Sequence, residues 1–156
     1  MFDGTGILMS LDDSGKVVYH DEWGAQYGLV TVRDFGTEEA PTFDSGEEEY
    51  VFLPSNLILA VRPDTEGDVT VEVRVGGADF AGHELLLEAR MMFSSSVVVI
   101  TTPTYVDEES LHLPRAGSWA VKVWVNSRPR PDSVILTLEP SEWNSVQSGW
   151  RADSPT

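Results

Sequence analysis

Alternation of apolar and polar side chains with a period of two is the feature that most constrains this fold. Residues 69–75 read Val-Thr-Val-Glu-Val-Arg-Val, so four valines lie on one face of an extended chain and Thr70, Glu72 and Arg74 lie on the other. The same period recurs in residues 118–126. A chain with this pattern forms half-buried β-strands, because a helix would scatter those valines around its circumference.

About eleven short segments favour a strand on this reasoning. They are residues 7–11, 16–20, 29–35, 50–53, 57–62, 69–75, 84–93, 96–101, 110–113, 118–126 and 134–138. Turn-forming residues separate them, as in Asp13-Ser14-Gly15 and Gly76-Gly77. Strands at this spacing predict an all-β fold, an antiparallel two-sheet β-sandwich, with a barrel as the alternative.

The pattern does not decide whether the segment from His83 to Phe93 forms a strand or a helix. Residues 84–92 are good helix formers, but the segment is short, has no cap and lies between two strand-like runs. We favour a strand there, with a helix as the alternative.

The length and composition fit one compact domain. The chain has 156 residues, and we assign residues 1–150 to a single β-sandwich and residues 151–156 to a mobile tail. Cysteine is absent from the sequence, which excludes disulfides and thiolate chemistry. The sequence shows neither a signal-peptide pattern nor an apolar run near the ~20 residues of a membrane helix. We therefore expect a cytoplasmic protein that makes no membrane contact.

Negative charge is distributed unevenly along the chain. The formal net charge is −16, of which residues 1–72 contribute −13 (16 acids, 3 bases) and residues 73–156 contribute −3 (10 acids, 7 bases). A one-sided negative field repels nucleic acid and attracts basic proteins. The charge pattern therefore predicts a basic protein partner and no direct contact with nucleic acid.

The acids are densest in residues 34–49, which contain seven acids and no base and are expected to form a long loop. This acidic stretch is either a solvated loop that keeps the protein soluble or a surface complementary to a basic protein, with aromatic anchors inside a polar rim. Tyr50 shares a strand face with Phe52, so the core is an alternative place for both. The candidate partner-binding residues are Asp34, Glu38, Glu39, Phe43, Asp44, Glu47, Glu48, Glu49 and Tyr50.

The tryptophan residues indicate an alternative function. Trp119 alternates with valines and is expected in the core, whereas Trp124, Trp143 and Trp150 are alternative ligand-binding residues. Exposed indoles on a sandwich can stack on sugars, and packing against a sheet or an edge is the competing interpretation. The alternative to a protein-binding role is thus a carbohydrate- or small-ligand-binding module.

Catalytic and metal-binding motifs find no support in the sequence. It contains no Gly-x-Ser-x-Gly elbow, no glycine-rich phosphate loop with its lysine, and no histidine pair at metal-ligand spacing. We expect a non-enzymatic protein without a cofactor or a metal ion. Homo-oligomerisation is left open, because a dimer is one way to protect the edges of a sandwich.

The segment Leu111–Val125 has a strand, a Leu-Pro-x-x-Gly turn and a second alternating strand. Together with residues 69–75 and 84–93, it resembles a set of small acidic β-sandwich proteins of actinobacteria and is distantly similar to the competence protein J family, whose members inhibit a secreted nuclease. The resemblance covers roughly residues 57–139, lies in the scaffold and leaves out the acidic stretch. It implies a two-sheet sandwich that acts by binding, with nuclease inhibitors and toxin-immunity proteins as candidate classes.

Overall fold

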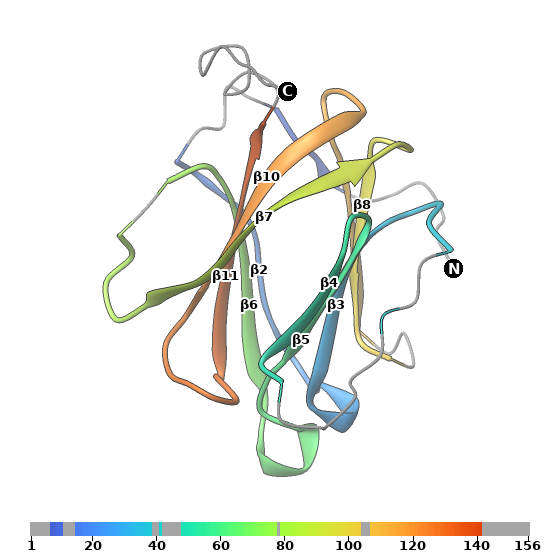
Figure 1. Cartoon of the computed structure of the whole chain (residues 1–156). Helices are drawn as coiled ribbons and strands as arrows, with labels where there is room; N and C mark the ends of the chain where they lie inside the picture. Colours follow the sequence, from blue (N-terminus) through green and yellow to red (C-terminus); the bar gives the residue numbers. More distant parts are fainter. Residues whose placement is uncertain are drawn as a thin grey trace.

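Two β-sheets pack face to face in the computed structural model, which describes residues 7–10, 15–38, 41, 48–77, 79–103 and 107–141. Eleven strands and two short 3-10 helices, η2 (Gln26–Gly28) and η3 (Asp64–Glu66), lie within these residues. The sheets do not close into a barrel, so the two-sheet sandwich prediction is confirmed (Figure 1).

The first sheet has six strands. In spatial order they are β1 (Ile7–Leu8), β9 (Glu108–His112), β8 (Val97–Thr101), β3 (Leu29–Asp34), β5 (Asn56–Ala60) and β4 (Tyr50–Leu53). The second sheet has five. They are β2 (Val17–Trp23), β6 (Val69–Val75), β11 (Ser133–Pro140), β10 (Gly117–Val125) and β7 (Glu84–Phe93).

Two strand pairs depart from the antiparallel pattern that the sequence predicts. β1 pairs with β9 and β6 pairs with β11 in parallel, so both sheets are mixed. Hairpin connections make sequential strands antiparallel, but β6 and β11 become neighbours only after the chain has crossed to the other sheet and returned. Local turn chemistry does not determine the direction of such a pair.

The alternation in the sequence correctly predicts which side chains face the core. Val69, Val71 and Val73 are fully buried, as is Trp119 of β10, whose indole Nε1 donates to the Arg115 carbonyl at 3.2 Å. Residues 84–93 form a strand rather than a helix, with every second side chain from Leu87 to Phe93 buried.

The edge strands of the first sheet are short, and those of the second sheet, β2 and β7, are longer but pair irregularly with their neighbours. β1 has two residues and β4 has four, while a β-bulge interrupts the pairing of β7 with β10. Near the end of β7 the Met92 N–H donates to the Pro54 carbonyl of the first sheet at 2.8 Å. Such features limit edge-to-edge association of sandwiches.

Candidate functional site

Asp34, the first residue of the acidic stretch, serves the scaffold. It ends β3 and is only 4% exposed. Its Oδ1 accepts hydrogen bonds from the Ser95 backbone N–H at 3.0 Å and the Ser95 hydroxyl at 2.7 Å, and its Oδ2 accepts one from the Gly36 N–H at 3.3 Å. Ser95 lies in the turn between β7 of the second sheet and β8 of the first. The Asp34 carboxylate therefore connects this turn to the end of β3.

Glu49, at the other end of the stretch, is paired within the chain. Its carboxylate accepts two hydrogen bonds from the Arg128 guanidinium, at 2.7 and 2.8 Å. These bonds hold the pKa of Glu49 below its usual value, although burial opposes the shift. Glu38 is exposed and Glu48 is half-buried. The other candidates of the stretch lie outside the described residues; they are Glu39, Phe43, Asp44 and Glu47.

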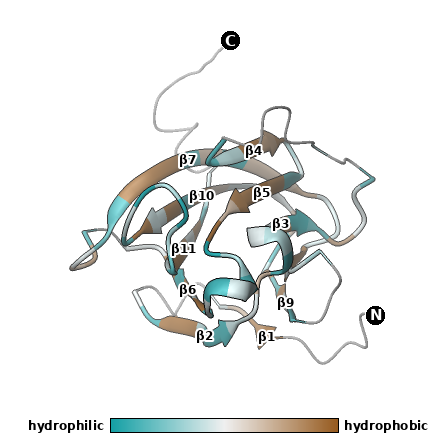
Figure 2. Cartoon of the chain, turned by 90° about the horizontal axis from the view of Figure 1, so that it is seen from below, coloured by the Kyte–Doolittle hydropathy of each residue, from teal (hydrophilic) through white to brown (hydrophobic). Residues whose placement is uncertain are grey.

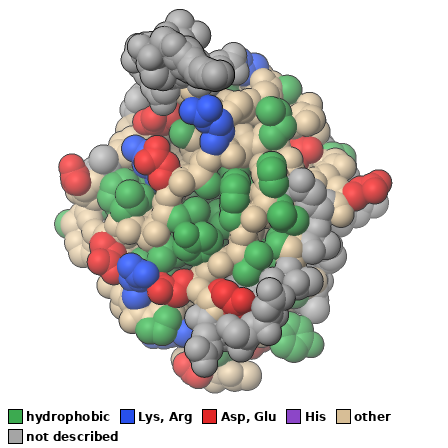
Figure 3. Space-filling view, in the orientation of Figure 1, with side chains coloured by type: hydrophobic (Ala, Val, Ile, Leu, Met, Phe, Trp, Pro, Cys, Tyr) green, Lys and Arg blue, Asp and Glu red, His purple; other side chains and the backbone are tan. Residues whose placement is uncertain are grey.

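Tyr50 lies on the exposed face of β4 together with Phe52, so neither side chain belongs to the core. The nearby strand β7 exposes Leu85 and Met92. Figure 3 shows hydrophobic side chains gathering on this side of the molecule, over β7 and β4. Aromatic side chains beside Glu49 reproduce in part the anchor-and-rim composition of protein interfaces.

Trp124 is buried, at 7% exposure, on the outer face of the second sheet. Phe80, from the connection before β7, covers it edge-on with the ring centroids 5.3 Å apart. The guanidinium carbon of Arg74 lies in turn 4.8 Å from the centre of the Phe80 ring. Trp124 therefore offers no open ring face to a ligand. Trp143 and Trp150 lie outside the described residues.

Carboxylates from three separate segments meet at one end of the sandwich, the lower end in Figure 1, which Figure 2 views directly. Two hydrogen bonds bring the segments together: the Gly24 N–H donates to Asp107 Oδ2 at 3.0 Å, and the Asp64 N–H donates to the Ala25 carbonyl at 3.0 Å. We call this region the acidic end. Its acids are Asp21, Glu22, Asp64, Glu66, Asp68, Asp107, Glu108 and Glu109.

The electrostatics of the acidic end reflect this crowding. The pKa of the Glu109 carboxyl is raised, first by burial and then by the nearby charges of Asp21 and Glu108, while a hydrogen bond from the Ser110 N–H opposes the shift. Burial also raises the pKa of Tyr19 to about 12, against the hydrogen bond that its hydroxyl accepts from the Trp23 indole at 2.9 Å. A cation placed here would relieve the repulsion between carboxylates.

Tyr27 stands at the same end with its side chain 79% exposed. Its backbone is in the left-handed region, at φ 60° and ψ 10°, which costs a residue other than glycine about 1–3 kcal/mol unless the surroundings impose it. Here the Gly28 N–H donates to the Ala25 carbonyl at 2.9 Å and the Val61 N–H donates to the Gly28 carbonyl at 2.8 Å. These bonds hold the Tyr27 backbone in its left-handed conformation, and the side chain projects into solvent.

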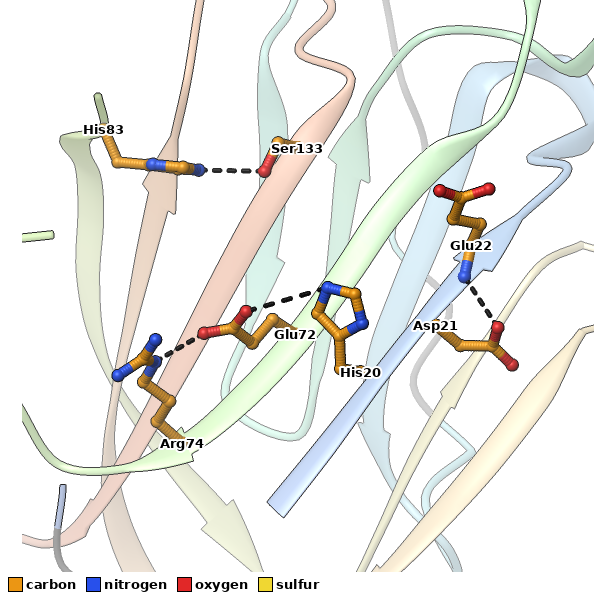
Figure 4. Close-up of polar contacts among 7 residues, drawn as sticks. All are labelled: His20, Asp21, Glu22, Glu72, Arg74, His83 and Ser133. Carbon is orange, nitrogen blue, oxygen red and sulfur yellow. Dashed lines mark hydrogen bonds and ion pairs between the residues drawn. The ribbon is translucent and has the colours of Figure 1, made fainter. Parts of the chain in front are cut away.

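A polar network crosses the outer face of the second sheet (Figure 4). Glu72 pairs with Arg74 and lies 3.9 Å from His20 Nε2. His83 Nε2 lies 2.9 Å from the Ser133 hydroxyl, and its Nδ1 lies 3.1 Å from the Ala81 carbonyl. The contact between His83 and Ser133 joins the segment before β7 to the start of β11. The Ser133 N–H also donates to the side-chain oxygen of Asn126.

A polar pocket of about 310 Å³ lies beside the start of the acidic stretch, on the outer face of the first sheet. Its lining includes Thr31, Arg33, Glu38 and Thr101. Within the described ranges, no three histidine, aspartate or glutamate side chains gather as metal ligands would. The described part of the chain also contains no helix with the length and apolarity needed to cross a membrane.

Comparisons with known proteins show a shared fold. No protein-family model matches the chain, and no curated protein matches it in sequence. The structure is similar to the crystal structure of ComJ, inhibitor of the DNA degrading activity of NucA, from Bacillus subtilis, with a TM-score of 0.62 and 15% identity over 79% of this chain and 96% of that one. It is also similar to a structure described as crocagin biosynthetic gene J, with a TM-score of 0.51 and 14% identity over 78% and 95%.

The sequence reasoning thus found an arrangement of strands shared with ComJ, while the actinobacterial resemblance receives no support from these comparisons. It missed the acidic end, because Asp107, Glu108 and Glu109 are distant in sequence from Asp21 and Asp64. The available signal was that acids sit beside several predicted strand ends, but strand order decides which ends meet.

Proposed function

We propose that this chain is a non-enzymatic binding protein that engages a basic protein through its acidic surface, as a nuclease inhibitor or toxin-immunity protein does. The observation that carries the proposal is the acidic end, where carboxylates of three segments lie at the same end of the sandwich as the exposed ring of Tyr27, with Asp64 beside it. An aromatic anchor within a charged rim is typical of protein interfaces, and the charge would steer a basic partner toward this end.

The fold likeness supports the same proposal. ComJ is an inhibitor of the DNA degrading activity of NucA, and it shares this arrangement of strands over nearly its whole length. A nuclease must bind an anionic substrate, so its nucleic-acid site is basic. An acidic protein can cover such a site by offering carboxylates where phosphates would bind.

Glu49, the last residue of the acidic stretch, is linked to the acidic end through the backbone. The Glu49 carbonyl accepts a hydrogen bond from the Ala60 N–H at 3.0 Å, and the next residue of that chain, Val61, bonds to Gly28 beside Tyr27. The proposed surface therefore runs from Glu48 and Tyr50 to Tyr27. Of the sequence candidates, Asp34 contributes to the scaffold rather than to this surface.

A nuclease-inhibition assay tests the proposal. The purified chain is titrated into DNA-degradation reactions of NucA and of any nuclease encoded beside its gene, at low and at physiological salt. We expect inhibition that weakens as salt increases and that the triple variant D64N/E66Q/D68N reduces. The variant E84Q/E88Q, which removes exposed carboxylates from β7, is the matched control and should inhibit normally. Equal inhibition by both variants would contradict the role of the acidic end.

A further inference from the structure

We propose that Tyr27 and the pocket beside it form a docking site for an arginine side chain of the partner. The inference rests on the proposed function, since it names the chemistry by which the acidic end holds a basic protein. The pocket has a volume of about 460 Å³, and its lining is made by η2 and η3 together: Gln26, Tyr27, Pro63, Asp64 and Thr65.

The ring of Tyr27 is available for such a contact. Among the described residues it makes no ring contact, and its hydroxyl takes part in no hydrogen bond. A guanidinium stacks on an exposed tyrosine ring by cation–π attraction. Because neighbouring backbone bonds fix Tyr27 in its left-handed conformation, docking would require little further ordering of the backbone.

Asp64 supplies a charged acceptor beside the ring. Its carboxylate is exposed and takes part in no ion pair among the described residues. A guanidinium presents five N–H donors in one plane and keeps its charge at every physiological pH. Arginine therefore matches this site, because its flat guanidinium can stack on the ring while its charge faces the Asp64 carboxylate.

The surrounding charges favour a cation as well. Glu66 and Asp68 follow Asp64 and are exposed. Of the nearby cations, Arg62 is paired with Asp132, and the Arg130 Nη1 lies near Gly28, 3.4 Å from where a Cβ would be. The three exposed carboxylates thus outnumber these two nearby arginines.

Small-molecule titration tests the site in the full chain. ¹⁵N-labelled protein is titrated with N-acetyl-argininamide, with the neutral citrulline analogue and with N-acetyl-norleucinamide. We expect the arginine probe to shift the amide signals of Gln26, Gly28 and Thr65, and Y27G to weaken its binding about tenfold. D64N should weaken binding to a lesser extent, and M92A, at an exposed position on β7, should leave it unchanged. Equal shifts with citrulline or norleucine, or arginine binding that survives Y27G, would overturn the inference.

Two controls keep the result interpretable. Glycine accepts the left-handed conformation without strain, so Y27G should unfold no earlier than the parent chain; D79G relaxes a similar backbone, at φ 59°, away from the site. Y27N serves in the same titration if Y27G is unstable. The nuclease assay separates this inference from the proposed function. If Y27G inhibited the nuclease as well as the parent chain does, arginine docking alone would be refuted. If the chain bound the arginine probe but inhibited no nuclease, the inhibitor role alone would be refuted.

Discussion

Removing the Asp34 carboxylate should destabilise the fold, although the residue belongs to the acidic stretch. In D34A the Ser95 N–H loses its acceptor, while the Ser95 hydroxyl can still donate to the Val97 carbonyl at 3.2 Å. A fully buried donor left unsatisfied costs about 1–3 kcal/mol, and this part-buried N–H should cost about 1 kcal/mol; the lost bonds from the Ser95 hydroxyl and the Gly36 N–H add to this. We therefore expect the free energy of unfolding to fall by about 2–3 kcal/mol.

An amide at this position should be milder. In D34N the side-chain oxygen can keep both bonds from Ser95, whereas the amide nitrogen would face the Gly36 N–H, donor against donor. We expect D34N to cost about 1 kcal/mol. At this chain length each kcal/mol lowers the melting temperature by about 2–4 °C, so D34A should melt about 5–10 °C below the parent chain.

Urea unfolding, followed by circular dichroism and tryptophan fluorescence, measures these differences. E38A is the matched control, because Glu38 is exposed in the same stretch and its truncation should stay within about 0.5 kcal/mol. If D34A and E38A unfolded at the same urea concentration, Asp34 would not be a scaffold residue, and its carboxylate would again be a candidate for partner binding.

Three further predictions concern other parts of the molecule. E49Q should lower the free energy of unfolding in urea by less than about 1 kcal/mol, since the ion pair of Glu49 with Arg128 is solvent-exposed. Folding lowers the pKa of Glu49, so the stabilisation by this ion pair is present above the unfolded-state pKa and is lost as the pH falls through the folded-state pKa. The pKa of Tyr19, about 12 against 10 unfolded, should make stability decline from about pH 10 to 12, and Y19F should abolish the late step in an ultraviolet titration. G28A should lower the melting temperature, because Gly28 has φ 68° and a Cβ there would lie 2.8 Å from the Val61 carbonyl oxygen.

The strands were predictable because their signal is local. A period of two specifies which face of residues 69–75 is buried, whatever the neighbouring strand is, and the same holds for residues 84–93 despite their helix-forming composition. The parallel pairing of β6 with β11 was not predictable, since it depends on a return from the other sheet. Strand order in space is a property of the whole chain rather than of any segment.

Side-chain roles were harder to predict than strands, for a similar reason. In the sequence, nothing distinguishes Asp34 from the other acids of its stretch. Its role in the scaffold depends on the hydrogen bond from Ser95, which lies 61 residues later in the chain. Trp124 lies on the outer face of its strand, as the alternation predicts, yet Phe80 folds over it and buries the ring. Glu109 becomes part of an acidic cluster only because β9 lies close to Asp21. Long-range contacts decide each of these cases.

The contacts also determine which part of the negative charge a partner would meet. Glu49 is bonded to Arg128, Glu72 to Arg74, and Asp132 to Arg62, so these pairs contribute little to the field around the molecule. The exposed carboxylates of the acidic end, such as Asp64, Glu66 and Asp68, should act mainly on the rate of association, with strong dependence on salt. An arginine docked on Tyr27 would act at short range and slow dissociation instead. Substitutions of the acidic-end carboxylates should therefore change mainly the association rate constant of the complex, and substitutions of Tyr27 its dissociation rate constant.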